Sequence, residues 1–500
     1  MKKAKFVSAC LLATMLATLL SGCGGEKKTE TKEEMVTLRY VMAGPGMQED
    51  SEKVWKAFND KLHEKLPNVT VDFEVFSMAD YRQKFMLMQT SGEQIDIVNM
   101  YGLDFAQEVA NGTLAPMDEL LNQYGEGVKA SLPEWLWDYM KIDGVQYGIP
   151  SYQQLSTFSA YATPTELADK YLDKEALEKA LYSSDFLSDE VYKIIEDYLQ
   201  KLKDNGELGL GMAQWEARKG IGEGIAGNYL VVNADGKPTV KYQFETELIK
   251  KEYKRHAEWY KKGFIREDSL SATDDSDKQG KPGGIVLWSE QYTPWTEENM
   301  TKKYGRPITL IPLSDTYSIG KDNAASGTSI MQSSKHKEEA MQVMNLIQSD
   351  KELYNLLVFG IEGEHYTKVS DDRIEVPYVT GHPSANDKYG IYKWIVGNTS
   401  LAYAIQTEPD GYKEWWMEEV NQTEDRSQFI GFIADTNAVA DKVAQINAIK
   451  GEYQASLNSG SLDDWEKTYG EWMKKIKAAG NDEVVAELQR QVDEFLANKQ

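Results

Sequence analysis

Hydrophobic residues occupy every second position between residues 36 and 42, which predicts a β-strand with one apolar face. The apolar positions on that face are Val36, Leu38, Tyr40 and Met42. A turn sequence, residues 43–46, follows directly. Apolar residues then recur at helical spacing over residues 54–66, and Pro67 ends the expected helix. This part of the chain is therefore expected to run strand, turn, helix.

The same order continues along the next stretch of the chain. Residues 69–75 alternate again and predict a second strand, residues 78–90 favour a helix, and residues 95–99 form a short buried strand. This β-α-β-α-β order is typical of an α/β fold with a parallel sheet. Ligands of such sheets bind beyond the carboxyl ends of the strands. We therefore expect loops 43–47 and 100–104 to lie near a binding site.

The chain begins with a pattern typical of an export signal. Lysines at positions 2, 3 and 5 precede an uncharged apolar run over residues 6–20, and Leu-Ser-Gly leads to Cys23. This order resembles the bacterial lipobox, in which the signal is cleaved before a cysteine that is then acylated. An ordinary secretory signal is the alternative. Residues 24–35 are polar and charged, which predicts a flexible tether.

The middle of the chain alternates between helical and extended patterns. Apolar faces at helical spacing predict helices over residues 191–202, 249–260 and 335–349. Residues 283–295 are expected to form a strand that runs into a loop, and residues 307–313 a further short strand. The glycine-rich stretch 206–227 is expected to be a loop. Residues 315–323 are expected to return to the first lobe, and the turn at residues 360–363 to cross between lobes again.

Three amphipathic helices are expected at the end of the chain, over residues 439–457, 465–476 and 485–495, with Gly480 ending the second. Three exposed apolar faces would aggregate, so these helices must pack against the rest of the protein. A structural buttress is favoured over a partner-binding coiled coil.

Charge and cysteine content narrow the possible partners. The formal net charge is −25, and cleavage before Cys23 would remove three lysines and no acidic residue, leaving −28. A balance this acidic argues against nucleic acid and against an anionic membrane surface as partners. The only other cysteine, Cys10, lies in the signal, so neither a disulfide nor thiol chemistry is expected. No metal and no cofactor are predicted.

Motifs with possible chemistry are weak in this sequence. Residues 222–227 match G-x-G-x-x-G, but no hydrophobic strand precedes them and Glu223 would repel a pyrophosphate. The five histidines are scattered, and the acidic residues at 274, 275 and 277 lack the glycine and glutamate of a calcium loop. No G-x-S-x-G motif is present, although counting residues does not exclude a pair of catalytic carboxylates.

Four segments resemble the extracellular solute-binding proteins, in the branch that serves carbohydrate ABC transporters. They are residues 92–121, with G-x-L-x-P near the end, the sequence DGVQYGIP at 143–150, NLLVFGIEGEHYTKV at 355–369, and the helical region from residue 427 onwards. The resemblance implies a two-lobed periplasmic-binding-protein-like fold of type II with a C-terminal helical extension. The expected parts are a signal (1–22), a tether (23–35), lobe one (36–148 with 318–361), lobe two (149–317 with 362–430) and a helical region (431–500).

The same resemblance implies a ligand site built from aromatic and polar side chains. In sugar-binding members of the family, aromatic rings stack on pyranose rings and polar groups bind hydroxyls. Trp288 is the favoured stacking residue here, and core packing is the alternative for every tryptophan. The further candidates are Tyr101, Trp215, Trp295, Trp394, Asn398, Asp104, Gln153 and Glu362.

These features together predict a binding protein and not an enzyme. We expect a monomeric, lipid-anchored substrate-binding protein on the extracytoplasmic face of the cell membrane. It would capture an oligosaccharide between two hinged lobes and deliver it to the permease of an ABC importer. A sensory or adhesive surface lipoprotein with the same fold is one alternative, and a surface glycoside hydrolase is another. The sequence does not specify which sugar is bound.

Overall fold

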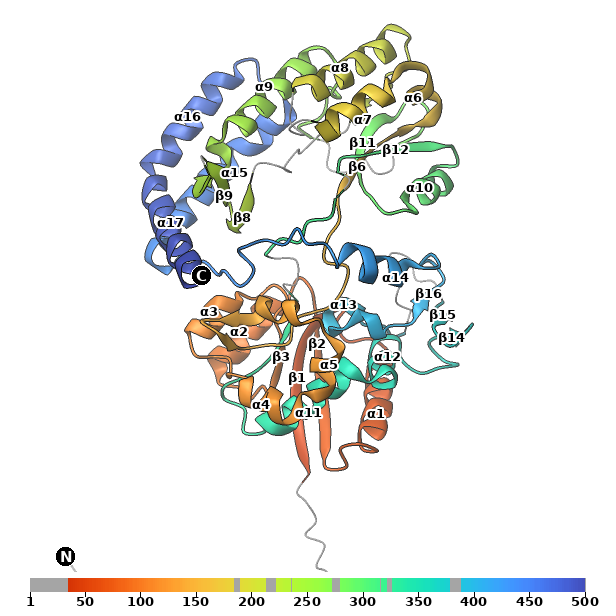
Figure 1. Ribbon diagram of the computed structural model, residues 1–500, viewed down its shortest axis with the longest axis vertical. Helices are drawn as coiled ribbons and strands as arrows, with labels where there is room; N and C mark the ends of the chain where they lie inside the picture. Colours follow the sequence, from red (N-terminus) through yellow and green to blue (C-terminus); the bar gives the residue numbers. More distant parts are fainter. Residues whose placement is uncertain are drawn as a thin grey trace, which may run out of the picture. The chain divides into compact units, whose positions relative to one another are not determined.

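The structure is a computed structural model that describes residues 35–183, 189–212, 222–234, 236–271, 279–314, 316–321, 326–377 and 388–499. Residues from Val36 to Gln500 form one compact unit (Figure 1). The expected signal, the lipidation site Cys23 and the tether up to residue 34 lie outside the described residues. Within the described ranges, no helix is both long and apolar enough to cross a membrane.

The first half of the fold is built on a four-stranded sheet with the order β13-β3-β1-β2. Its strands are β1 (Val36–Gly44), β2 (Val69–Ser77), β3 (Ile97–Asn99) and β13 (Thr328–Ile330). β1 pairs in parallel with both β2 and β3, as the sequence predicts. The helical crossovers return the chain to the end of the sheet at which the previous strand began, so the three strands run in the same direction. β13 is antiparallel to β3 and was not predicted.

Helices cover this sheet and close the first hydrophobic core. They are α1 (Ser51–Leu62), α2 (Tyr81–Ser91), α3 (Phe105–Ala110), α4 (Asp118–Tyr124), α5 (Glu126–Ser131), α11 (Lys337–Ser349) and α12 (Lys351–Phe359). α1 packs on α12, and α11 packs on α4 and α5. A 3₁₀ helix (Glu134–Met140) and the hairpin of β4 (Lys141–Ile142) and β5 (Val145–Gln146) follow α5.

The second half is built on a sheet with the order β12-β6-β11-β7. The strands are β6 (Ser159–Pro164), β7 (Gly211–Met212), β11 (Ile285–Gln291) and β12 (Ile308–Pro312). β6 is antiparallel to both of its neighbours. The associated helices are α6 (Thr165–Tyr171), α7 (Lys174–Ser183), α8 (Asp189–Asp204), α9 (Glu247–Lys261) and α10 (Thr296–Tyr304).

A separate three-stranded antiparallel sheet begins within the expected glycine-rich loop. It consists of β8 (Glu223–Ala226), β9 (Tyr229–Ala234) and β10 (Lys237–Tyr242). The expectation of a loop over residues 206–227 is therefore wrong for residues 223–226, and also for residues 211–212, which form β7. β10 contacts the last helix of the chain, so this sheet connects the second half to the C-terminal region.

The C-terminal helices belong to the second hydrophobic core. They are α15 (Ala440–Ser459), α16 (Trp465–Ala478) and α17 (Asn481–Asn498). Trp472 is fully buried, and its ring lies 5.0 Å from that of Phe244 and stacks on Tyr453. The expectation that these helices pack against the rest of the protein is confirmed, because their buried residues join the same cluster as α8 and α9.

The buried residues form two large cores and a small third cluster on the second sheet, and the two cores differ from the expected lobes in one segment. Residues 362–430 were assigned to lobe two, but the buried side chains between Ile374 and Val420 join the first core. This segment contains β14 (Thr367–Lys368), β15 (Arg373–Glu375), α13 (Lys393–Val396), β16 (Ala404–Ile405) and α14 (Tyr412–Trp415). The turn at Gly360 is therefore not a crossing between the cores.

Three segments, which we call the crossing segments, join the two cores: residues 151–158, residues 316–321 and residues 421–428. The first two are linked because the Ser156 hydroxyl donates to the Ser318 carbonyl over 2.6 Å. The second and third are linked because the Ile319 amide donates to Asp425 and its carbonyl accepts from Ser427, each over 2.9 Å. The segments therefore form one bonded unit between the cores.

Candidate ligand-binding site

One cavity between the two cores has a volume of about 670 Å³, and we call it the boundary cleft. The first core contributes Arg82, Tyr139, Met140 and residues of the segment 100–106. The second core contributes residues 224–229 and part of the C-terminal region, and Lys321 comes from a crossing segment. A solute in this cleft would touch both cores and a segment that connects them.

The first-core wall of the boundary cleft follows the carboxyl end of β3. Asp104, which was predicted as a ligand residue from this loop, lines the cleft. Its carboxylate also accepts the Gln107 amide over 3.1 Å and caps the short helix α3. The loop at 100–104 is therefore at the cavity, as expected for the carboxyl edge of a parallel sheet.

The second-core wall is the hairpin of β8 and β9. Its two-residue turn consists of Gly227, at φ +56°, and Asn228. Glycine is favoured at the first position of such a turn because other residues rarely adopt a positive φ. The G-x-G-x-x-G match thus places its last glycine in a hairpin turn. A Gly-Asn pair before the run Tyr229–Val232 was the signal that could have revealed this hairpin.

A smaller cavity of about 310 Å³, which we call the hinge cavity, lies beside the first crossing segment. Residues 153–157 form one side, and Gln291 at the end of β11 contributes from the second sheet. The remaining walls come from the segment 393–416 of the first core. They consist of Lys393, Trp394, Thr399, Ala402, Tyr403, Glu408, Tyr412, Lys413 and Trp416.

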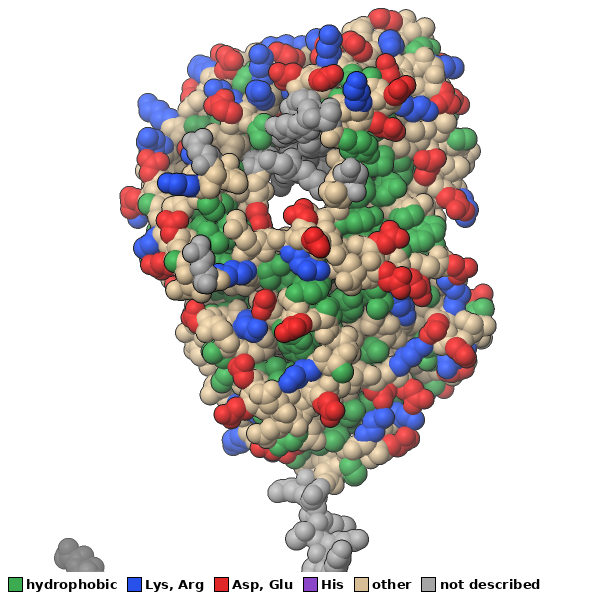
Figure 2. All heavy atoms as spheres, viewed as in Figure 1, with side chains coloured by type: hydrophobic (Ala, Val, Ile, Leu, Met, Phe, Trp, Pro, Cys, Tyr) green, Lys and Arg blue, Asp and Glu red, His purple; other side chains and the backbone are tan. Residues whose placement is uncertain are grey.

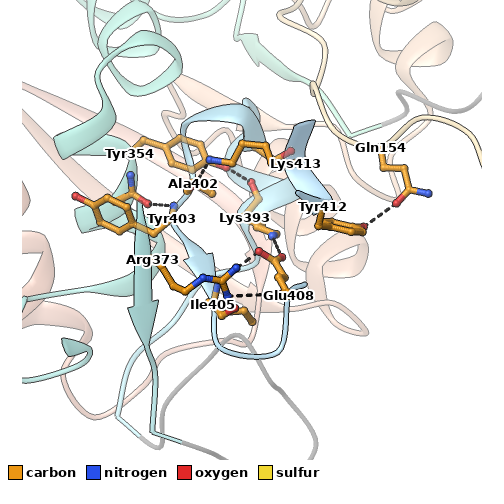
Figure 3. A network of polar contacts seen from close by, with 12 residues as sticks. Gln154, Tyr354, Arg373, Lys393, Ala402, Tyr403, Ile405, Glu408, Tyr412 and Lys413 are labelled. Atoms are coloured by element: carbon orange, nitrogen blue, oxygen red, sulfur yellow. Dashed lines mark hydrogen bonds and ion pairs between the residues drawn. The ribbon is translucent and has the colours of Figure 1, made fainter. Parts of the chain in front are cut away.

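Charged and aromatic groups of the hinge cavity are joined in the network of Figure 3. Lys393 forms an ion pair with Glu408. The Tyr412 hydroxyl donates to the side-chain carbonyl of Gln154 over 2.7 Å, and burial, with a smaller effect of Glu408, raises the pKa of Tyr412 to about 12. Tyr412 is therefore un-ionised at neutral pH. Burial also lowers the pKa of Lys413, whose ammonium donates to the Ala402 carbonyl.

Asn99, at the end of β3, positions two of the predicted aromatic residues. It is fully buried, and its amide nitrogen donates to the carbonyls of Gly327 (3.2 Å) and Ile395 (3.1 Å). Its side-chain oxygen accepts the Tyr101 amide over 3.0 Å. The rings of Tyr101 and Trp394 then meet edge to face, 5.2 Å apart. Sequence reasoning did not select Asn99, because asparagine at a strand end usually signals only a turn.

The predicted site residues are distributed unevenly around the two cavities. Trp394 and Gln153 line the hinge cavity, and Asp104 lines the boundary cleft. Tyr101 contacts Trp394, and the half-buried Trp295 packs against Tyr412 at 6.0 Å and Trp415 at 5.6 Å. Trp215 lies outside the described residues.

Three predicted residues lie away from both cavities. Trp288 is 2% exposed, packs edge to face on Tyr304 of α10, and donates to Glu290 over 2.8 Å. Asn398 is fully buried and donates to the Gln348 carbonyl, which is a structural contact. Glu362 is exposed and pairs with Lys368 at 3.4 Å. Core packing, the alternative for Trp288, fits these contacts, because a side chain so enclosed offers no face to a ligand.

Within the described ranges, no three His, Cys, Asp or Glu side chains are grouped as metal ligands would be. On the face seen in Figure 2, acidic and basic side chains are interspersed, and hydrophobic side chains gather near its middle.

Comparison with known proteins identifies the family. The family model of the bacterial extracellular solute-binding proteins matches residues 44–353, more than half of the chain. The chain belongs to this family of solute-binding proteins. A second family model, described as a domain of unknown function, matches residues 428–497, which include the C-terminal helices. Members of the first family bind solutes and are not enzymes.

Individual relatives support the same fold over nearly the whole length. A carbohydrate ABC transporter substrate-binding protein of Streptococcus pneumoniae serotype 4 is 23% identical over 100% of this chain and 99% of its own. The crystal structure of the N-glycan transport solute binding protein NgtS from Streptococcus pneumoniae is 21% identical, with a TM-score of 0.71 over 93% of this chain and 100% of that chain.

The S. pneumoniae ABC-transporter substrate binding protein FusA in complex with kestose has a TM-score of 0.58 at 15% identity, over 93% of this chain and 100% of that chain. This solute-binding protein therefore has the two-lobed, type II periplasmic-binding-protein-like fold with a C-terminal helical extension.

Proposed function

We propose that this solute-binding protein captures an oligosaccharide between its two cores and delivers it to an ABC importer. The observation that carries the proposal is the boundary cleft, whose walls come from both cores and from Lys321 of a crossing segment. A solute that contacts both walls would stabilise the closed arrangement over the open one. Such a difference in affinity is what a hinged binding protein needs in order to signal that it is loaded.

An oligosaccharide is the solute class that fits the surroundings best. The hinge cavity offers aromatic walls at Trp394, Tyr403 and Tyr412, together with hydroxyl and amide groups. Flat rings suit the apolar faces of sugars, and polar groups suit their hydroxyls. NgtS has also been solved in complex with Man1GlcNAc, and that structure has a TM-score of 0.62 to this chain.

Four of the predicted residues have suitable positions for this role. Trp394, supported by Tyr101, would stack on a sugar ring, and Gln153 would bind a hydroxyl in the hinge cavity. Asp104 would accept hydroxyl hydrogen bonds in the boundary cleft. Arg82, Asn228 and Lys321 line the same cleft and are added to the proposed set.

Anchoring completes the proposal. Acylation at Cys23 would hold the protein at the outer face of the membrane, because acyl chains contribute about 0.8 kcal/mol per buried CH₂. The polar residues 24–35 would act as the tether, and the permease subunits of the importer would bind the loaded, monomeric protein. Metabolic labelling with a fatty-acid analogue tests this step: the label should be present in the wild type and absent from Cys23→Ser.

Titration calorimetry against a panel of neutral and acidic oligosaccharides tests the binding function. At least one should bind with micromolar affinity or better, and chromatography of the mixture should show the sugar unchanged. A folded protein that gives no heat with any of them would overturn the proposal. Release of shorter products would instead indicate a glycoside hydrolase.

A further inference from the structure

The hinge cavity carries a positive charge, although the protein as a whole is strongly acidic. Its lining contains two lysines, Lys393 and Lys413, and one acidic residue, Glu408. The formal charge of the lining is therefore +1, in a chain whose net charge is −25. We propose that this cavity binds a sugar ring that carries a carboxylate, so that the captured oligosaccharide is acidic. The inference rests on the proposed function and specifies its ligand.

Lys413 is the group that would bind the carboxylate. Within the part of the chain that the structure describes, no carboxylate lies within ion-pair distance of its ammonium. The two nearby acids already have partners, because Glu408 pairs with Lys393 and Asp372 pairs with Lys351. The Lys413 ammonium donates to the Ala402 carbonyl. An ammonium has three donors, so two remain for water or a ligand.

The partly buried position of the Lys413 ammonium favours the binding of an anion in the hinge cavity. Its side chain is partly enclosed by the cavity walls, and burial lowers its pKa because the charged form is poorly solvated there. Partly buried charges are normally paired, and hydrogen bonds between ions are stronger than those between neutral groups. Asp372 and Glu408 attract this ammonium from beyond ion-pair distance, so a ligand carboxylate would supply a direct ionic partner that a neutral sugar lacks.

The rest of the cavity suits a single sugar ring. Its volume of about 310 Å³ is at the lower end of the range of small-molecule sites. Trp394 and Tyr412, both half-buried, provide flat surface, and Gln153 and Thr157 provide polar groups. The terminal ring of a chain would therefore fit, while the remaining rings would extend out of the cavity.

The neighbouring acidic groups are paired with other cations, so the Lys413 ammonium stays available to a ligand. Arg373 donates to the backbone carbonyls of Ile405 and Glu408 and pairs with Asp410 at 2.7 Å, which fixes the loop that carries Glu408. Glu408 thus remains held by Lys393 (Figure 3). The charged groups that act on Lys413 in the described chain include Asp372, Lys351, Lys393 and Glu408.

Calorimetry with matched ligands tests the inference. Three oligosaccharides that differ only at one terminal ring are needed, ending in a neutral hexose, in a uronic acid or in a sialic acid. We expect one or both acidic forms to bind at least tenfold more tightly than the neutral form. The affinities for the uronic-acid and sialic-acid ligands show whether the cavity prefers a compact ring or a bulkier ring of the same charge. Raising the salt concentration should reduce the preference.

Two variants and one control assign the preference to Lys413. Lys413→Gln should abolish the difference in affinity between acidic and neutral ligands. Lys413→Met, which keeps a long unbranched side chain, should also abolish the difference between acidic and neutral ligands. Lys179→Gln, at an exposed lysine, is the control and should leave the affinity for each ligand unchanged. If neither variant folds, the salt dependence of the wild-type preference decides.

The outcomes separate the two proposals. If no ligand of the panel binds, the proposed function fails. If the three forms bind equally well, or if an acidic preference survives in Lys413→Gln and Lys413→Met, the carboxylate inference is overturned while the proposed function stands. An acidic preference that both variants lose supports the inference.

Discussion

Glu223 of the second core accepts a hydrogen bond from the hydroxyl of Ser427 in the third crossing segment. Its other carboxylate oxygen accepts the backbone amide of Lys321, in the second crossing segment, over 3.0 Å. One side chain at the start of β8 therefore holds two of the three segments between the cores. It also fixes the hairpin that forms the second-core wall of the boundary cleft.

Replacing Glu223 should loosen this junction. Glu223→Ala removes two hydrogen bonds to a charged acceptor, so we expect the free energy of unfolding to fall by about 2 kcal/mol. Small-angle scattering of the unliganded protein should show a broader range of dimensions, and ligand affinity should fall. Glu178→Ala, which changes an exposed acid on α7, is the control. Equal stability and scattering for the two variants would contradict the role assigned to Glu223.

The stability of the protein should be sensitive even to the change of a single side-chain atom at Asn99. Asn99→Ala leaves the buried Ile395 carbonyl without its donor and removes one of the two donors of the Gly327 carbonyl, which keeps the Met100 amide. A buried acceptor that loses its partner costs about 1–3 kcal/mol. Asn99→Asp keeps the acceptor for Tyr101 but places a carboxylate oxygen against two carbonyls. We therefore expect Asp to be at least as destabilising as Ala in urea unfolding.

The exposed Asn122→Ala is the matched control for these variants. A fully stable Asn99→Asp would show that the two carbonyls do not depend on this side chain. Because Asn99 positions Tyr101 and Trp394, the destabilised variants should also bind sugar more weakly.

The sequence predicted most of the regular elements because their patterns are local. β1, β2 and the helices α8, α9 and α11 each show the period of their own structure over several residues. β13 has only three residues, Thr328 to Ile330, which is too short a stretch for a period to be recognised. Its antiparallel place beside β3 is determined by tertiary contacts.

The third crossing was placed wrongly because a glycine turn has more than one use. Gly360, at φ +82°, ends α12, and a side chain there would meet the His365 ring at 2.7 Å. The glycine is needed for close packing inside the first core. The real crossing, residues 421–428, has no glycine or proline to distinguish it.

Side-chain type alone also could not separate binding tryptophans from buried ones. In β11 the residues from Ile285 to Trp288 are all buried, so the strand lacks the alternation that would assign Trp288 to one face. The cavity residues from 393 to 416 come from short elements held together by contacts such as the Tyr354 hydroxyl bond to the Lys393 carbonyl. No sequence period marks such a segment.

His256 of α9 should make the second core sensitive to acid. The side chain is buried, and burial, with a smaller effect of Arg255, lowers its pKa from 6.5 to about 4. Between pH 6.5 and pH 4, His256 therefore stays neutral in the folded protein but becomes protonated in the unfolded chain. Stability should be complete above pH 6.5 and should fall as the pH drops toward 4, by about 3 kcal/mol.

The comparison that isolates this effect is between the wild type and His256→Gln. Both proteins share their carboxylates, so the difference between their unfolding free energies, followed from pH 7 to pH 4, reports His256. We expect the wild type to lose more stability than the variant over this range. Parallel curves would show that the folded protein takes up the proton as readily as the unfolded chain.

Trp394 and Trp288 should respond in opposite ways to truncation. Trp288 is enclosed by the second sheet and α10, so Trp288→Ala should cost about 3–5 kcal/mol of stability. Trp394 is half-buried and lines the hinge cavity. Trp394→Ala should cost less stability but weaken sugar binding by about tenfold or more, because one stacking surface is lost.

Unfolding in urea and calorimetry on both variants check this contrast, and Trp394→Phe should recover part of the binding because it retains a flat ring. Trp288→Phe should recover part of the stability instead, since it refills most of the space against Tyr304. If Trp288→Ala folds normally and loses only binding, the sequence-based preference for Trp288 as the stacking residue is right and the assignment of Trp394 is wrong. The two substitutions therefore locate the sugar with respect to the hinge cavity.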